Sequence, residues 1–277
     1  MVTGAARGLG AQFCHAISNA GGTILALGRD EAALAAMIAD LSGTGHDLIL
    51  ADVTKTDAVA DGLARRQFDG LVNNAGIAVT AALHASAEDD VRRVIDTNLL
   101  GSLWTLQAAV PVLKAAGGGV IVNIASVLGH RPLPHTGIYA ASKAAIIQMT
   151  RSAAVELARD HIRVNALAPT AGTRMTEDLM PPEMLGLLTA ESVTAAALVL
   201  CDETAPTRTI LCAGAGGYAK SGMYETDGIF LPQAEQNPEA IVAQWDELSD
   251  VSNHQPLESG SKQTEKFLMK AMAALKA

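Results

Sequence analysis

A serine, a tyrosine and a lysine in the middle of the chain have the types and spacing of a proton-transfer site. Ser126 follows residues 119–125, a β-branched apolar run typical of a strand buried on both faces of a parallel sheet. Tyr139 and Lys143 are four residues apart at the start of a predicted helix, so their side chains lie on one face. Because ligands of open α/β sheets bind at the carboxyl ends of the strands, Ser126 is placed where chemistry is expected.

The lysine would give the tyrosine its chemistry. A free tyrosine has a pKa of about 10 and is a poor base at neutral pH. A cation within about 4 to 6 Å lowers an acid's pKa by roughly 1 to 3 units, so we expect Lys143 to lower the pKa of Tyr139. Ser126 would hold the reacting oxygen by a hydrogen bond. Tyrosine and lysine at this spacing also occur on ordinary helices, so the assignment depends on the rest of the chain.

Three glycines near the start of the chain predict a phosphate-binding turn. Gly4, Gly8 and Gly10 would allow a tight turn and a close approach of the backbone to a pyrophosphate. The amino terminus of the next helix would face the negative charge. An amphipathic segment at residues 9–20 and a strand at residues 23–27 follow, which is the order that a dinucleotide-binding fold requires.

The strand before this turn is short. Only Met1, Val2 and Thr3 precede Gly4, although this strand should be the central one, beside which the sheet changes direction. We therefore expect a truncated first strand. We favour a true start of the protein upstream of Met1 over a protein that tolerates a damaged sheet, because nothing further along the sequence looks degraded.

Four further motifs accompany the serine, tyrosine and lysine. They are, in chain order, Thr3-Gly-Ala-Ala-Arg-Gly8-Leu-Gly10, Asp52-Val53, Asn73-Asn74-Ala75-Gly76 and Asn98. Over residues 1 to about 215 the whole set resembles the short-chain dehydrogenase/reductase family. The resemblance implies an α/β fold with a doubly wound, mostly parallel Rossmann-type sheet and helices on both faces.

The resemblance also assigns catalytic roles. Tyr139 would exchange a proton with the substrate oxygen, Ser126 would polarise that oxygen, and Lys143 would also hold the nicotinamide ribose. Asn98 lies inside a predicted helix, where asparagine has poor propensity, and its implied role is in a proton relay from the lysine to solvent. The alternative for Asn98 is an ordinary solvated helix residue.

The dinucleotide would be NADP(H), with NAD(H) as the alternative. NAD-dependent enzymes usually place a carboxylate at the end of the second strand, whereas arginine suits the 2′-phosphate of NADP. Gly28 stands there and Arg29 follows, while Arg7 lies in the glycine turn, where family members that use NADP often carry a basic residue. Asp52 would approach the adenine ring, a role compatible with capping the next helix. The expected cofactor-binding set is Gly4, Arg7, Gly8, Leu9, Gly10, Arg29, Asp52, Val53, Asn74, Ala75, Gly76, Tyr139, Lys143 and Pro169.

The sequence after the sixth predicted strand bears on the substrate. Residues 165–183 resemble the substrate loop of the (3R)-hydroxyacyl-CoA dehydrogenase domains of peroxisomal multifunctional beta-oxidation enzymes, and the similarity continues into residues 237–245. We therefore expect a hydride transfer between the nicotinamide cofactor and a β-hydroxyacyl or β-ketoacyl thioester. Arg131, Arg174 and Lys220 are candidates to meet coenzyme A phosphates, against the simpler interpretation that each is an ordinary solvated charge.

Two other functions stay open. One is a dehydrogenase of another secondary alcohol or a hydroxysteroid, which an apolar pocket lined by Leu179, Met180, Met184 and Leu185 would suit. The other is a cofactor-binding scaffold without turnover, which the short first strand suggests. The complete set of serine, tyrosine, lysine and asparagine positions argues against the scaffold.

The chain continues well past the last predicted strand. We expect a dinucleotide-binding and catalytic domain at residues 1–213 and an extension at residues 214–277. Asn237-Pro238 is a good helix start, because asparagine caps and proline suits the first helical position. Phe267 and Leu275 mark a final amphipathic helix, so we expect the extension to pack on the same domain or on a partner subunit, where it could close one end of the substrate cleft.

Composition limits the partners. The 277 residues carry a net charge of −9, which argues against nucleic acid and against anionic membranes. The three cysteines and seven histidines show no metal-ligand spacing, so no metal is expected, and the cysteine usage suits a reducing compartment. With neither a signal peptide nor a run of 18 apolar residues, a cytoplasmic location is expected. The family resemblance implies a small-molecule substrate and a homodimer or homotetramer.

Overall fold

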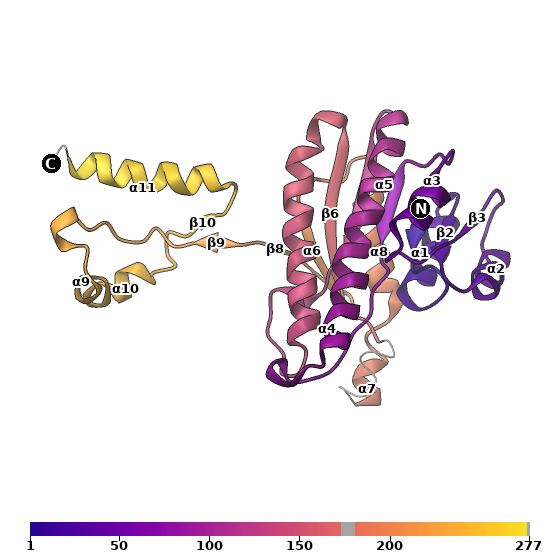
Figure 1. Ribbon diagram of the computed structural model, residues 1–277, viewed down its shortest axis with the longest axis horizontal. Helices are drawn as coiled ribbons and strands as arrows, with labels where there is room; N and C mark the ends of the chain where they lie inside the picture. The colour runs from indigo at the N-terminus through magenta and orange to yellow at the C-terminus, as the bar shows by residue number, and fades with distance from the viewer. Residues whose placement is uncertain (173–180, 276–277) are drawn as a thin grey trace. The chain divides into compact units, whose positions relative to one another are not determined.

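A computed structural model describes residues 1–172 and 181–275, apart from the side chain of Pro182. The chain divides into two compact units, Met1–Lys220 and Ser221–Ala277 (Figure 1). Three residues named above as candidates for substrate contacts, Arg174, Leu179 and Met180, lie outside the described residues.

Within the described residues, the first unit is built on one eight-stranded sheet in the order β3-β2-β1-β4-β5-β6-β7-β8. Strands β1 to β7 pair in parallel. The chain winds outward from β1 to β3 and then crosses to β4 on the other side of β1, so the order reverses between β1 and β4. The strands are β1 (Val2–Thr3), β2 (Leu25–Gly28), β3 (Asp47–Leu50), β4 (Gly70–Asn73), β5 (Gly119–Ile124), β6 (Ile162–Pro169), β7 (Ile210–Gly214) and β8 (Gly217–Ser221).

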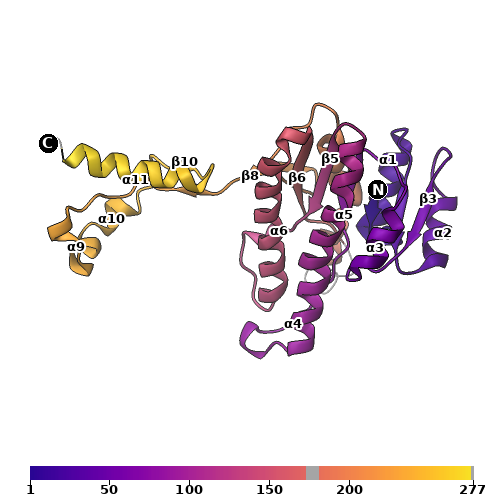
Figure 2. The same cartoon turned by 45° about the horizontal axis from the view of Figure 1, so that its top comes forward.

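Helices cover both faces of this sheet. One buried cluster joins strand residues to Phe13 of α1, Leu34 of α2 and Leu200 of α8, and the opposite cluster contains Val59 of α3 and Leu113 of α5. Figures 1 and 2 show α5 and α6 side by side on one face. The doubly wound α/β fold expected from the sequence is thus confirmed. The helical elements are α1 (Gly8–Asn19), α2 (Glu31–Ala39), α3 (Thr56–Leu63), η1 (Leu83–Ala85), α4 (Glu88–Val94), η2 (Ile95–Leu100), α5 (Gly101–Ala115), η3 (Val127–Gly129), α6 (Gly137–Glu156), η4 (Ala158–Asp160), α7 (Pro182–Leu185) and α8 (Ala190–Cys201).

The central strand is as short as the sequence predicts. Strand β1 has two residues, and Val2 pairs with Ala26 of β2 and Val72 of β4. The amine of Met1 donates a hydrogen bond to the carbonyl of Gly70 at 2.5 Å. Burial lowers the pKa of this amine to about 6. Short as it is, β1 therefore joins the two halves of the sheet.

One described segment, Glu183–Cys201, is long and apolar enough to cross a membrane by length and composition alone. The helix α8 makes up most of it. Val193, Ala197 and Leu200 of α8 are buried in the cluster that also contains Phe13 of α1. This burial is the pattern of a core helix, in which the apolar side chains contact other parts of the protein.

The second unit has little core of its own. None of its described residues is fully buried, and Phe267 is 51% exposed. Ion pairs from Lys266 to Glu225 and from Lys270 to Asp227 hold the last helix against the chain near β9. The predicted helix start is confirmed, since the Asn237 side chain caps α9. Docking of this unit on the first domain or on a partner subunit stays a prediction. The elements are β9 (Tyr224–Glu225), η6 (Gln233–Glu235), α9 (Pro238–Ala243), α10 (Trp245–Leu248), β10 (Gln255–Pro256) and α11 (Gly260–Ala274).

Candidate active site

The structure brings Ser126, Tyr139 and Lys143 together at the carboxyl end of β5. Ser126 begins the turn after this strand, where its hydroxyl accepts a hydrogen bond from Leu128 N at 3.2 Å. The Ser126 side chain also forms a hydrogen bond with Tyr139. On α6, Lys143 Nζ lies 5.9 Å from the centre of the Tyr139 ring and donates to the carbonyl of Ile124 at 2.7 Å. One strand end and one helix face therefore position all three groups.

The pKa of Tyr139 does not follow the expectation from the sequence. Burial raises the pKa of Tyr139, and the hydrogen bond with Ser126 offsets only part of that effect. Burial also lowers the pKa of Lys143 to about 8, because a 4% exposed ammonium loses its hydration. The prediction that Lys143 lowers the pKa of Tyr139 is thus wrong for this structure. Desolvation disfavours the charged form of both groups and sets the direction of both pKa shifts.

The buried lysine makes a testable contribution to stability. Its pKa is about 8 in the folded protein against 10.5 for a free lysine, so the unfolded state binds more protons between these values. The free energy of unfolding should therefore rise with pH in this window, by about 2 kcal/mol between roughly pH 8 and pH 10. Urea denaturation of the wild type and of Lys143→Met measures this pH dependence. The contributions of the other titrating groups cancel in the difference between the two proteins. A pH-independent difference would contradict the burial argument.

Asn98 connects the candidate active site to the loop after β4. Its side chain accepts a hydrogen bond from Ile77 N at 2.8 Å and donates to Ile77 O at 2.9 Å. It also donates to Ser142 Oγ at 3.0 Å, and Ser142 Oγ donates to the carbonyl of Tyr139 at 2.7 Å. Asn98 is fully buried, so the alternative of a solvated helix residue is wrong. Its part in a proton relay stays a prediction.

The helix around Asn98 widens into a π-helix. The segment η2 (Ile95–Leu100) is π-helical between α4 and α5. Such segments inside α-helices are frequently found at functional sites. The poor helix propensity of asparagine was the signal in the sequence. Here the side chain bonds outside its own helix, to the Ile77 peptide and to α6.

Thr3, for which the sequence predicts no separate role, joins β1 to the loop after β4, at the point where the strand order reverses. Its hydroxyl accepts hydrogen bonds from Asn74 N at 2.9 Å and Ala75 N at 3.0 Å. Asn74 returns a bond from its side-chain amide to Thr3 O at 3.0 Å. A hydroxyl-bearing residue at the end of the first predicted strand, directly before Gly4, was the signal in the sequence that could have identified it. The predicted Asn74 and Ala75 thus lie beside the glycine turn.

The glycine turn is suited to a pyrophosphate. Gly4 and Gly8 have φ values of 63° and 58°. A residue with a side chain would be strained in this backbone conformation. A Cβ on Gly10 would lie 2.1 Å from the carbonyl oxygen of Gly4, so only glycine fits where α1 meets the turn. Among the described residues no side chain caps the helix start at Arg7, and the first turn of α1 has no acidic residue. Its amides are thus available to an anion, while Leu9 packs against the core.

The residues predicted to surround the adenosine lie at the ends of β2 and β3. Asp52 accepts hydrogen bonds from the amide and hydroxyl of Thr54, both at 2.9 Å, in the turn before α3. The N-cap of α3 is Lys55 and, in the part of the chain that the structure describes, no side chain bonds to the start of that helix, so the alternative that Asp52 caps it is wrong. Burial acts to raise the pKa of Asp52, but the bonds from Thr54 and the charge of Arg29 outweigh it and lower the pKa. Arg29 lies 3.3 Å from Asp52. Val53 is buried in the core, with its side chain against Gly101.

Two further predicted positions border the catalytic residues. A Cβ on Gly76 would lie 3.2 Å from Asn98 Oδ1 and 3.5 Å from Lys143 Nζ, so the backbone of Gly76 passes close to both. Pro169 ends β6, the strand that pairs with β5. The loop after β4 and the end of β6 thus lie at the same carboxyl edge of the sheet as Ser126.

Arg7 and the substrate candidates lie further out. Arg7 pairs with Asp30 at 3.3 Å, beside the start of α2. Arg131, Lys220 and Met184 are exposed. Contacts of these last three with a substrate stay predictions.

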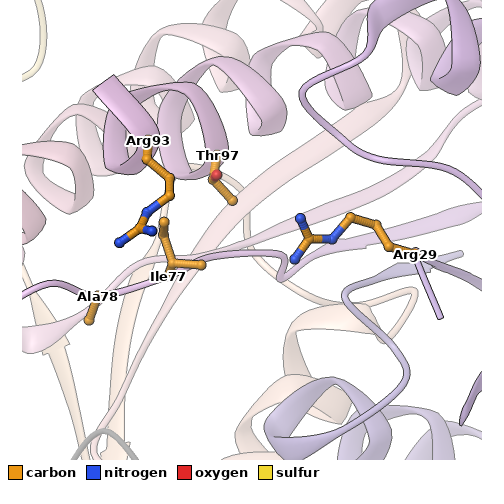
Figure 3. A pocket seen from close by; sticks show the side chains of 5 residues that line it. All are labelled: Arg29, Ile77, Ala78, Arg93 and Thr97. Atoms are coloured by element: carbon orange, nitrogen blue, oxygen red, sulfur yellow. The ribbon is translucent and has the colours of Figure 1, made fainter. Parts of the chain in front are cut away.

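A cavity of about 380 Å³ opens beside the loop after β4, lined by Arg29, Ile77, Ala78, Arg93 and Thr97 (Figure 3). Arg93 and Thr97 were not predicted to take part in a site. An arginine four residues before a threonine on one helix is a weak signal, because surface helices carry such charges routinely.

Comparisons with known proteins agree with this geometry. Residues 1–183 match the short chain dehydrogenase family. The chain is 30% identical over 281 residues to the peroxisomal hydratase-dehydrogenase-epimerase of Neurospora crassa, which covers 92% of this chain but only 30% of that protein. It is 37% identical over 175 residues to galactitol 2-dehydrogenase of Agrobacterium fabrum, which covers 61% of this chain and 68% of that enzyme.

A solved structure shows the same fold. Full-length peroxisomal multifunctional enzyme type 2 from Drosophila melanogaster matches with a TM-score of 0.81 and 23% identity, over 99% of this chain and 49% of that one. The family match, the parallel sheet and the residues at its carboxyl edge lead to one assignment. The chain belongs to the short-chain dehydrogenase family and is an oxidoreductase that uses a nicotinamide dinucleotide on a small-molecule substrate.

Proposed function

We propose that this oxidoreductase interconverts a β-hydroxyacyl thioester and the β-ketoacyl thioester with NADP(H). The observation that carries the reaction type is the grouping of Ser126, Tyr139 and Lys143 beside Gly76 at the carboxyl edge of the sheet. The thioester is supported by the similarity to the fungal hydratase-dehydrogenase-epimerase, which extends over the C-terminal extension as well as the catalytic domain.

The residues divide the chemistry as follows. The bound cofactor supplies or accepts the hydride. Burial raises the pKa of Tyr139, so its hydroxyl is protonated at neutral pH and is ready to give a proton to a substrate carbonyl oxygen. Ser126, hydrogen-bonded to Tyr139, would hold the same oxygen. Asn98 and Ser142 would fix the first turn of α6 and anchor the relay that returns a proton.

The cofactor preference rests on the end of β2. Gly28 leaves no carboxylate to accept a hydrogen bond from a ribose 2′-hydroxyl, and Arg29 follows it. The guanidinium of Arg29 is exposed and faces the carboxyl edge beside Asp52. A cation there favours the additional phosphate of NADP(H). NAD(H) remains the alternative.

A secondary alcohol of another kind is the second candidate, because the galactitol 2-dehydrogenase of Agrobacterium fabrum is 37% identical over part of the chain. Nicotinamide absorbance separates the two when β-hydroxyacyl-CoA thioesters, galactitol and a hydroxysteroid are compared with NADP and NAD. We expect kcat/KM for a thioester with NADP to exceed the others by about 100-fold or more. Faster turnover of galactitol would replace the thioester proposal, and dinucleotide binding without any turnover would indicate the scaffold.

A further inference from the structure

Two arginine side chains line the cavity beside the loop after β4. Arg29 extends from the loop that follows β2, and Arg93 extends from α4 toward the Ile77–Ala78 segment (Figure 3). Thr97 lies one helical turn beyond Arg93 and lines the same space. The two guanidinium groups therefore reach one cavity from elements far apart in the sequence.

Both arginines keep hydrogen-bond donors available. Arg29 lies 3.3 Å from Asp52 through Nη1, and Arg93 lies 2.8 Å from Asp90 through Nη2. A guanidinium has five N–H donors, so neither contact uses its full capacity. The two side chains are 73% and 63% exposed, which leaves them able to turn toward a ligand. The placement suits a dianionic group that both can approach in bidentate fashion.

We propose that Arg93 is a specificity-determining residue that binds the 2′-phosphate of NADP(H) together with Arg29. The proposal rests on the cofactor preference of the proposed function. Arg29, which follows the end of β2, lines one part of the cavity. Ile77, which directly follows Gly76 in the loop after β4, lines another part. Its volume of about 380 Å³ is ample for a phosphate together with part of the adenosine.

Coenzyme A also carries a phosphate on its adenosine ribose, at the 3′ position, so the shared chemistry is a ribose phosphomonoester. The position of Arg29 favours the dinucleotide, because Arg29 contacts Asp52, where the adenine is expected. Short nucleotides separate the two sources without any turnover. They are 2′,5′-ADP, 3′,5′-ADP and 5′-AMP, whose binding to the full chain calorimetry can measure.

Arg93→Gln removes the charge, and Arg92→Gln is the matched control on the same helix. Arg92 pairs with Glu88 at 2.6 Å, is 70% exposed and does not line the cavity. For Arg93→Gln we expect the Kd of 2′,5′-ADP to rise by about 10-fold or more, since a hydrogen bond between charged groups is lost. The Kd of 5′-AMP should stay within about 2-fold of wild type. Arg92→Gln should leave both unchanged, and Arg29→Gln should behave like Arg93→Gln.

Three outcomes would overturn the proposal. Equal losses for 2′,5′-ADP and 5′-AMP would place Arg93 against the adenosine itself. Tighter binding of 3′,5′-ADP than of 2′,5′-ADP would assign the cavity to coenzyme A. Equal wild-type affinity for 2′,5′-ADP and 5′-AMP would remove the phosphate site, while turnover in the substrate panel would still support the oxidoreductase proposal. Conversely, if Arg93→Gln weakens binding of 2′,5′-ADP but not of 5′-AMP, the role of Arg93 is supported even when the substrate is not a thioester.

Discussion

Tyr139→Phe should lower kcat by about 1,000-fold or more and leave dinucleotide affinity within about 2-fold of wild type. The substitution removes one hydroxyl, the group that Ser126 contacts and that would exchange the proton. The aromatic ring is kept in the first turn of α6, so the local fold should persist. Nicotinamide absorbance measures the rate, and quenching of protein fluorescence on titration with the dinucleotide measures the affinity.

Tyr218→Phe is the matched control for this experiment. Tyr218 lies on β8, is 53% exposed and would lose the same hydroxyl group. Its rate should equal that of the wild type. Normal turnover by Tyr139→Phe would remove Tyr139 from the mechanism, and with it the basis for assigning the reaction to this edge of the sheet.

Gly10→Ala should cost most of the dinucleotide affinity, about 100-fold or more, and about 3 kcal/mol of unfolding free energy. An added Cβ would lie 2.1 Å from Gly4 O and 2.7 Å from the side-chain nitrogen of Asn74. Since backbone cannot move aside as a flexible side chain does, α1 must shift away from the turn. That shift removes the helix start from the pyrophosphate. Urea denaturation and titration with the dinucleotide measure the two effects.

Gly222→Ala provides the comparison. A Cβ at Gly222 meets nothing within 4 Å, so the same methyl group should leave stability and dinucleotide affinity unchanged. If Gly10→Ala binds the dinucleotide as the wild type does, the close approach of α1 to the turn is not what positions the cofactor.

Much of this architecture could be predicted from local patterns. The glycine spacing, the apolar strands and the order of strand and helix signals gave the doubly wound sheet, and the three residues before Gly4 gave a short β1. Asn98 was recognisable because asparagine is a poor helix former at a position inside a helix. Each of these signals depends on the residue and its near neighbours in the sequence.

The remaining features depend on burial and on contacts between distant residues. The pKa of Tyr139 was predicted in the wrong direction because spacing shows that Lys143 is near but does not show that both groups are desolvated. Arg93 looked like an ordinary charge on a surface helix, since its i,i+3 contact with Asp90 is local. Only the packing of α4 over the loop after β4 places it opposite Arg29.

The hydrogen bonds between Asn98 and the Ile77 backbone link the loop after β4 to the catalytic helix α6. Asn98 holds both the N–H and the C=O of Ile77 and is joined through Ser142 to the main chain of Tyr139. We therefore expect a displacement of the loop after β4 to be transmitted through these hydrogen bonds to the first turn of α6, which carries Tyr139. If the nucleotide binds against this loop as proposed, we expect its position and that of the Tyr139 hydroxyl to be coupled.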